Sequence, residues 1–94
     1  MKEFEVDIKT FAKAININSD VLRSWLNYNW KLQVFTKRKR NPKYRQPLMH
    51  VTINDEFIKL FLDFLSTRHN RISKGISTIE YENNFLEFIE NYQR

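Results

Sequence analysis

Acidic residues are missing from the middle of this chain: residues 21–54 contain no Asp and no Glu. The same segment holds eight of the sixteen Lys and Arg residues, while the rest of the chain has eight basic and eleven acidic residues. The formal charge of +5 is therefore concentrated in one segment of an otherwise slightly acidic protein. A concentrated positive charge predicts a polyanionic partner. The alternative is a solvated charged face, which usually mixes both signs.

Other absences narrow the class of protein further. There is no Cys, which excludes disulfides and thiolate metal sites. One Gly and two Pro, with 41% apolar residues, argue against disorder. The most apolar stretch, residues 57–65, is short and broken by Lys59 and Asp63, so no membrane span is predicted. The first residues alternate charged and apolar side chains without a signal-peptide pattern, and we expect a cytoplasmic protein.

The sequence carries no recognisable catalytic or metal-binding motif. His50 and His69 have no partner at metal-ligand spacing. No nucleophile–base arrangement, phosphate-binding loop or inward pair of carboxylates is evident. We therefore expect no cofactor, no small-molecule ligand and no catalysis by this chain alone.

Two short helices joined by three residues are predicted near the N-terminus. Asp7 can cap a helix that runs to about Ile15, and Asn18 or Ser19 can cap a second helix over about 19–29. Asn16 tolerates left-handed backbone angles and can end the first helix, which fits a helix-turn-helix. The predicted buried positions recur at helical spacing: Ile8, Phe11, Ala12 and Ile15, then Val21, Leu22, Trp25 and Leu26.

A β-hairpin with a cationic tip is predicted next. Residues 31–36 have strand character, residues 48–53 read as the returning strand, and Asn41-Pro42 favours a turn between them. Phe4 and Val6 form a short strand or an apolar lead-in. Trp30 is expected to seal the hairpin against the helices.

The last forty residues predict two amphipathic helices. Asn54 can cap the first, and Ser77 with Glu80 can cap the second after a turn over 70–76. We expect residues 1–66 to form the main domain and residues 67–94 to pack on its core or to mediate dimer or partner contacts. The apolar residues outside the main stripes predict such an interface unless the two helices cover each other: Ile58, Leu62, Leu86 and Tyr92.

The order helix, turn, helix, basic hairpin, helix is that of a winged helix. Residues 7–65 resemble the MerR-like and excisionase-like winged helix-turn-helix domains, through Ile8-Lys9-Thr10-Phe11-Ala12-Lys13-Ala14-Ile15-Asn16-Ile17 and Asn18-Ser19-Asp20-Val21-Leu22-Arg23-Ser24-Trp25. The resemblance implies a mainly α fold with a β-hairpin wing and a C-terminal helical hairpin. It also implies that the second helix enters a DNA major groove, that Arg23 contacts phosphate or a base, and that the hairpin follows the backbone or minor groove.

The chain departs from that family in its longer, more basic hairpin and in its short helical tail, which replaces a long coiled coil and effector domain. A small excisionase-like factor or regulator of a mobile genetic element therefore fits its size. The predicted DNA-contacting residues lie on the polar side of the second helix and along the basic segment: Ser19, Arg23, Ser24, Asn27, Lys31, Lys37, Arg38, Lys39, Arg40, Lys43, Tyr44 and Arg45.

Duplex DNA is the favoured partner, and two other hypotheses remain. Alternation puts the hairpin cations on both faces of the ribbon, so not all of them can touch one duplex. Tyr44 can stack on a base, which keeps a single strand possible. The chain can instead be an accessory subunit of a mobile-element polymerase, primase or helicase that docks by residues 54–94. A third hypothesis is a protein-binding module that offers its cationic hairpin to an acidic site.

Overall fold

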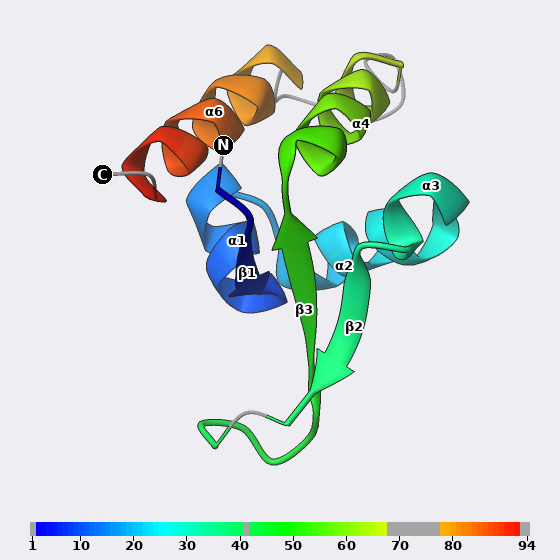
Figure 1. Ribbon diagram of the computed structural model, residues 1–94, viewed down its shortest axis with the longest axis vertical. Coiled ribbons are helices and arrows are strands. Elements are labelled where there is room, and N and C mark those ends of the chain that lie inside the picture. Colours follow the sequence, from blue (N-terminus) through cyan, green and yellow to red (C-terminus); the bar gives the residue numbers. More distant parts are fainter. Residues whose placement is uncertain (1, 41, 68–77, 93–94) are drawn as a thin grey trace.

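The computed structural model describes residues 2–40, 42–67 and 78–92 (Figure 1). The predicted turn over 70–76, the Ser77 cap and His69 lie outside these residues. The described elements follow in the order β1 (Phe4–Asp7), α1 (Ile8–Ile15), α2 (Ser19–Tyr28), α3 (Trp30–Gln33), β2 (Thr36–Lys39), β3 (Leu48–Ile53), α4 (Asp55–Thr67) and α6 (Thr78–Tyr92).

The strands form a three-stranded antiparallel sheet with the order β1-β3-β2. The short N-terminal strand suggested by Phe4 and Val6 is confirmed, and Val6 pairs with Val51 of β3. Alternate residues of β3 are buried against the helices, among them Met49 and Ile53, while His50 lies on the opposite face, half-buried. The sheet therefore has one face in the core and one outer face.

The predicted turn between the first two helices is confirmed in detail. The Asp7 carboxylate accepts a hydrogen bond from the Thr10 amide at 2.9 Å and caps α1. Asn16 adopts the left-handed conformation, with φ of 64° and ψ of 50°, and ends that helix. The Asn18 side chain then accepts from the Asp20 amide at 2.8 Å and starts α2. The side chains of Asp7 and Asn18 thus start the two short helices, and the left-handed backbone of Asn16 ends the first.

The strand predicted over 31–36 is wrong. Residues Trp30–Gln33 form the one-turn helix α3, and strand β2 begins only at Thr36. The Asn29 side chain accepts a hydrogen bond from the Lys31 amide at 3.0 Å, which starts the helix, and Leu32 is fully buried. Capping and the burial of one leucine outweigh the strand propensity of the β-branched and aromatic residues around it.

Two predictions about individual side chains are also corrected. Trp30 does not seal the hairpin, because 74% of it is exposed. Val21 is exposed as well, whereas Leu22 and Leu26 are fully buried on α2. Trp25 is half-buried and packs on the core at α4, with its ring 5.6 Å from that of Phe64. Helix α2 therefore packs mainly against α1 and α3, and its Trp25 reaches α4.

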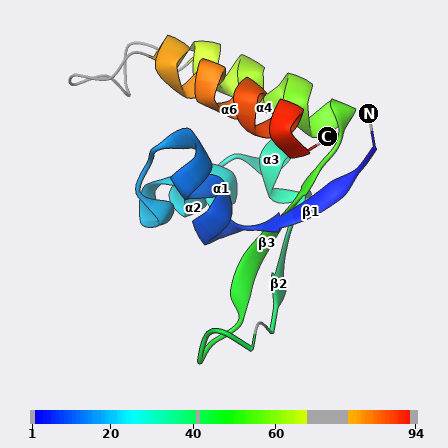
Figure 2. The same cartoon turned by 90° about the vertical axis from the view of Figure 1, so that its left-hand side faces the viewer.

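A cluster of phenylalanines joins the helices. The rings of Phe11 on α1, Phe57 and Phe61 on α4, and Phe85 on α6 are all fully buried, with centroids of Phe61 and Phe85 4.8 Å apart. Helices α4 and α6 lie side by side across one end of the molecule, and the β2–β3 hairpin extends from the other (Figures 1 and 2). Because β2 buries none of its residues, the hairpin adds charge to the surface and little to the core.

The architecture is therefore a mixed one, with helices packed on one face of a small antiparallel sheet. It is compatible with the coarse class expected from the sequence, helices combined with a β-hairpin. Among the residues that the structure describes, no helix is long and apolar enough to span a membrane.

Candidate nucleic-acid interface

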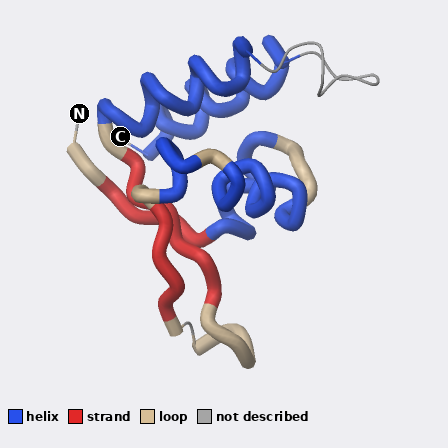
Figure 3. The backbone as a smooth tube through the Cα atoms, turned by 90° about the vertical axis from the view of Figure 1, so that its right-hand side faces the viewer, coloured by secondary structure: helices blue, strands red, loops and turns tan. Residues whose placement is uncertain are grey.

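The basic hairpin is the most protruding part of the molecule. Strands β2 and β3 run away from the helices, and their connection bends toward the side on which α1 and α2 lie (Figures 2 and 3). The described residues of this connection are exposed, including Arg40 and Arg45. Cationic side chains are thus presented beside the two short helices and away from α4 and α6.

The alternation of β2 divides its three cations between the two faces of the sheet. Arg38 pairs with Met49, which is buried against the helices, so Arg38 lies on the helix side of the ribbon. Lys37 pairs with His50 and therefore lies on the outer face. Lys39 follows Lys37 at the strand period and shares that outer face.

Glu5 of β1 binds both outer lysines. Its carboxylate lies 3.1 Å from the Lys37 ammonium and accepts a second contact from Lys39. The Lys39 hydrogen bond lowers the pKa of Glu5, burial opposes this, and Lys37 adds to the lowering. The Glu5 carboxylate in turn raises the pKa of Lys39. One carboxylate therefore offsets part of the positive charge of two lysines.

The arginines of the hairpin have different surroundings. We call Arg38, Arg40 and Arg45 the arginine set; all three are exposed. In residues 2–40, 42–67 and 78–92, no acidic side chain forms an ion pair with any of them. A guanidinium with no carboxylate partner retains its full charge and its planar donor fork for phosphate oxygens.

Lys9 on α1 is a cation of this surface that the sequence analysis did not include. Its ammonium lies over the ring of Tyr44, 4.6 Å from the centroid, and so joins α1 to the hairpin connection. Lys13 follows one turn later and is also exposed. Lys9 and Lys13 are four residues apart and therefore share the outer face of the predicted helix, and this spacing was the signal for them in the sequence. One face of the Tyr44 ring is thus occupied by an ammonium group.

Helix α2 presents the remaining predicted polar residues. Arg23, Ser24 and Asn27 are exposed, and Ser19 is half-buried at the start of the helix. The Arg23 guanidinium lies 3.0 Å from the carboxylate of Asp20, one turn earlier. Because both side chains are largely exposed, this ion pair is weak and leaves Arg23 able to turn toward another anion.

Lys31 and Lys43 complete the predicted set. Lys31 lies on α3, outside the hairpin, and its ammonium is 5.6 Å from the centroid of the Trp30 ring. Lys43 is exposed in the hairpin connection. The structure therefore brings Lys43, Tyr44 and the arginine set together on the hairpin, and separates Lys31 from them.

The described residues contain no cluster of three or more His, Asp or Glu side chains suited to a metal ion. Comparison of the chain with protein-family models, with curated proteins and with solved structures found no match. The chemistry of the side chains is therefore the basis for any functional conclusion.

Proposed function

We propose that this chain is a DNA-binding protein of the winged helix-turn-helix type, an excisionase-like architectural factor or small regulator of a mobile genetic element. The observation that carries the proposal is the arginine set: three exposed guanidinium groups that have no acidic partner among the described residues, on a ribbon beside two short helices. Phosphate contacts by such groups supply most of the affinity of proteins for DNA.

In this proposal α2 enters the major groove and the hairpin follows the neighbouring backbone. Ser24 and Asn27 face base edges, where hydroxyl and amide groups read hydrogen-bonding patterns. Arg23 and the arginine set contact phosphates. With about four such contacts, the logarithm of the binding constant falls with the logarithm of the salt concentration at a slope of roughly −4.

The excisionase-like assignment depends on the resemblance of residues 7–65 and on the size of the chain. The turn at Asn16 supports it, because the short connection and its left-handed residue are what a helix-turn-helix requires. Strand β1 supports it too, because pairing with β3 fixes the base of the hairpin relative to α1.

The test is a titration of a labelled duplex and of each of its single strands, at 50 and 200 mM salt. We expect the duplex to bind more tightly than either strand, and its affinity to fall at the slope given above. Tight binding to single strands alone would reject the major-groove arrangement. No binding to any of the oligonucleotides at 50 mM salt would reject DNA as the partner.

An accessory subunit of a mobile-element replication enzyme is the second candidate. The observation that favours it is on α6, where Ile79 and Leu86 are 60% and 47% exposed and lie seven residues apart on one side of the helix. Such a stripe suits docking of the helical tail on an enzyme. Co-purification with a polymerase, primase or helicase that is lost in the Ile79→Ser, Leu86→Ser variant would support it, and retention in that variant would contradict it.

A further inference from the structure

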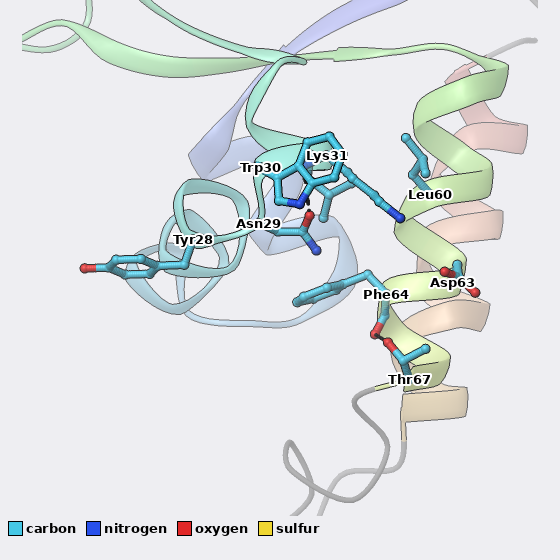
Figure 4. A pocket seen from close by; sticks show the side chains of 9 residues that line it. Tyr28, Asn29, Trp30, Lys31, Leu60, Asp63, Phe64 and Thr67 are labelled. Carbon is cyan, nitrogen blue, oxygen red and sulfur yellow. Dashed lines mark hydrogen bonds between the residues drawn. The ribbon is translucent and has the colours of Figure 1, made fainter.

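A second surface, at the opposite end of β3 from the hairpin connection, has no part in the proposed DNA contact. It lies between α3 and α4 (Figure 4). One hollow of about 320 Å³ is bounded by Trp30 and Lys31 on α3 and by Leu60 and Phe64 on α4. A second hollow of about 300 Å³ lies between Val34 and Glu56 and shares Trp30, Lys31 and Leu60 with the first. The two hollows therefore adjoin and form one groove, which we call the α3–α4 groove.

The α3 wall of this groove carries two of the three most exposed large apolar side chains among the residues described. Trp30 is 74% and Val34 76% exposed, and they lie four residues apart, one above the other. Tyr28 is 86% exposed at the edge, where its ring points away from α4 (Figure 4). Contiguous apolar surface beside a groove marks a site for another macromolecule, whereas single exposed apolar residues are common.

The α4 wall supplies carboxylates at a regular interval. Glu56 lines one hollow and Asp63 the other, with Leu60 between them. Seven residues of an α-helix separate the two carboxylates by about 10 Å along the helix axis. Lys31 reaches from α3 toward α4 (Figure 4), so the groove is lined by two carboxylates and one ammonium group. The α4 residues that line the groove therefore favour cations flanking an apolar ridge.

We propose that the α3–α4 groove binds a basic amphipathic helix of a partner protein. The α4 wall from Glu56 to Thr67 is about 17 Å long, at 1.5 Å per residue, which suits three turns of a docked helix. Apolar residues of the partner at i, i+4 and i+7 contact Trp30, Val34 and Leu60. Two Lys or Arg residues spaced seven apart on its flank meet the two carboxylates of α4.

Charge argues against the other occupants. A nucleic acid strand would bring its phosphates to Glu56 and Asp63. A second copy that docked its α6, on which Ile79 and Leu86 are exposed, would bring Glu80, Glu82 and Glu87 to the same two carboxylates. Either occupant would place like charges next to each other in the groove, which is unfavourable.

The experiment is a selection from a displayed library of 15-residue peptides. Leu is fixed at four positions with helical spacing, and the other positions vary among Lys, Glu, Gln and Ala. We expect selection on the wild-type chain to enrich peptides with two Lys seven residues apart. A synthetic peptide of the enriched sequence should lose at least tenfold in affinity on the Trp30→Ala, Val34→Ser variant. Both side chains are exposed, so the melting temperature of this variant should stay close to that of the wild type.

Charge reversal and a matched control complete the design. The Glu56→Lys, Asp63→Lys variant should enrich peptides with Glu at the same two positions. The Ile79→Ser, Leu86→Ser variant removes two exposed apolar residues from α6 and should bind the peptide as the wild type does. The variant with the arginine set changed to Ala should also retain the peptide, so that loss of DNA binding and loss of peptide binding are separate results.

Three results would overturn the proposal. The first is enrichment of no helical peptide, or of peptides that bind the Trp30→Ala, Val34→Ser variant equally well. The second is quenching of Trp fluorescence by an oligothymidylate of twelve nucleotides, if the quenching is lost in the Trp30→Phe variant. That result would make the groove a stacking site for bases. The third is concentration-dependent dimerisation in sedimentation velocity that is lost in the Trp30→Ala, Val34→Ser variant, which would make it an interface between copies.

Discussion

The arginine set and the two lysines of strand β2 are alike in sequence and differ in what surrounds them. Lys37 and Lys39 share the carboxylate of Glu5 on the outer face of the sheet. Arg38, between them in the sequence, lies on the helix side and has no acidic partner in the described part of the chain. The comparison teaches that a run of four basic residues is not one charged unit, because the strand period and a carboxylate from a distant strand divide it.

The largest expected effect comes from removing the arginine set. We expect Arg38→Ala, Arg40→Ala, Arg45→Ala to weaken duplex binding on the order of 100-fold at 0.1 M salt and to reduce the salt slope by roughly 3, because three phosphate contacts are lost. Fluorescence anisotropy of a labelled duplex measures both quantities. An unchanged salt slope in this variant would mean that the hairpin does not contact the backbone.

The matched control removes the lysine cluster instead. The Glu5→Gln, Lys37→Gln, Lys39→Gln variant deletes both ion pairs and lowers the net charge by one. We expect its duplex affinity to remain within about threefold of the wild type. In the wild type the Glu5 carboxylate already competes with phosphate for both lysines, so their removal costs little. An effect as large as that of the arginine variant would show that the two sets are equivalent and that Glu5 does not divide them.

The Glu5→Gln variant tests the same difference between arginines and lysines by removing the shared carboxylate and keeping both lysines. Without the carboxylate, the positive charge of Lys37 and Lys39 on the outer face is no longer offset. We expect non-specific duplex affinity to rise about fivefold to tenfold at low salt and the salt slope to steepen by about 1. The same titrations check this, and an affinity equal to that of the wild type would mean that the outer face stays away from the DNA.

Much of the helical part follows from the sequence because its signals are local. Asp7, Asn16 and Asn18 act within four residues of the backbone groups that they bind, so capping chemistry places both helices and the turn between them. The returning strand over 48–53 is equally local, since its alternation is visible in the sequence. These elements need no knowledge of the tertiary structure.

The remaining features depend on contacts between distant residues. Leu32 is buried by the surrounding helices, and that burial turns a strand-like segment into α3 and leaves Trp30 outside. Glu5 reaches Lys37 and Lys39 only because β1 and β2 flank β3 in one sheet. Neither effect has a signature in the residues involved. The positive charge of the hairpin was therefore predictable from the sequence, whereas its division into two groups and the addition of Lys9 were not.

A smaller effect is expected on α2. Arg23→Ala should weaken duplex binding about fivefold to tenfold, which corresponds to one phosphate contact, and should leave the melting temperature almost unchanged because the ion pair with Asp20 is exposed. Asp20→Asn is the matched variant: it leaves Arg23 in place, removes its partner and should strengthen binding slightly. A large drop in melting temperature for Arg23→Ala would assign this residue to the fold instead.

The smallest effect on DNA affinity is expected at Asp7, which separates stability from binding. Burial raises the pKa of Asp7, but hydrogen bonds from the amide and hydroxyl of Thr10 outweigh it and lower the pKa in the folded protein. A lowered folded-state pKa gives stability that is present above the unfolded-state value, about 3.9, and is lost as the pH falls through the folded-state pKa. Asp7→Ala should therefore cost about 1 kcal/mol of unfolding free energy at pH 7.

Asp7→Asn distinguishes the cap from its charge. The amide oxygen of Asn still accepts from the Thr10 amide, so this variant should keep most of the stability at pH 7. It cannot titrate, so the difference between wild type and Asp7→Asn should shrink as the pH falls below about 4 in urea titrations. Duplex affinity and salt slope should match the wild type in both variants. If Asp7→Asn weakened DNA binding as strongly as removal of the arginine set does, the position of α1 beside the hairpin would depend on that carboxylate.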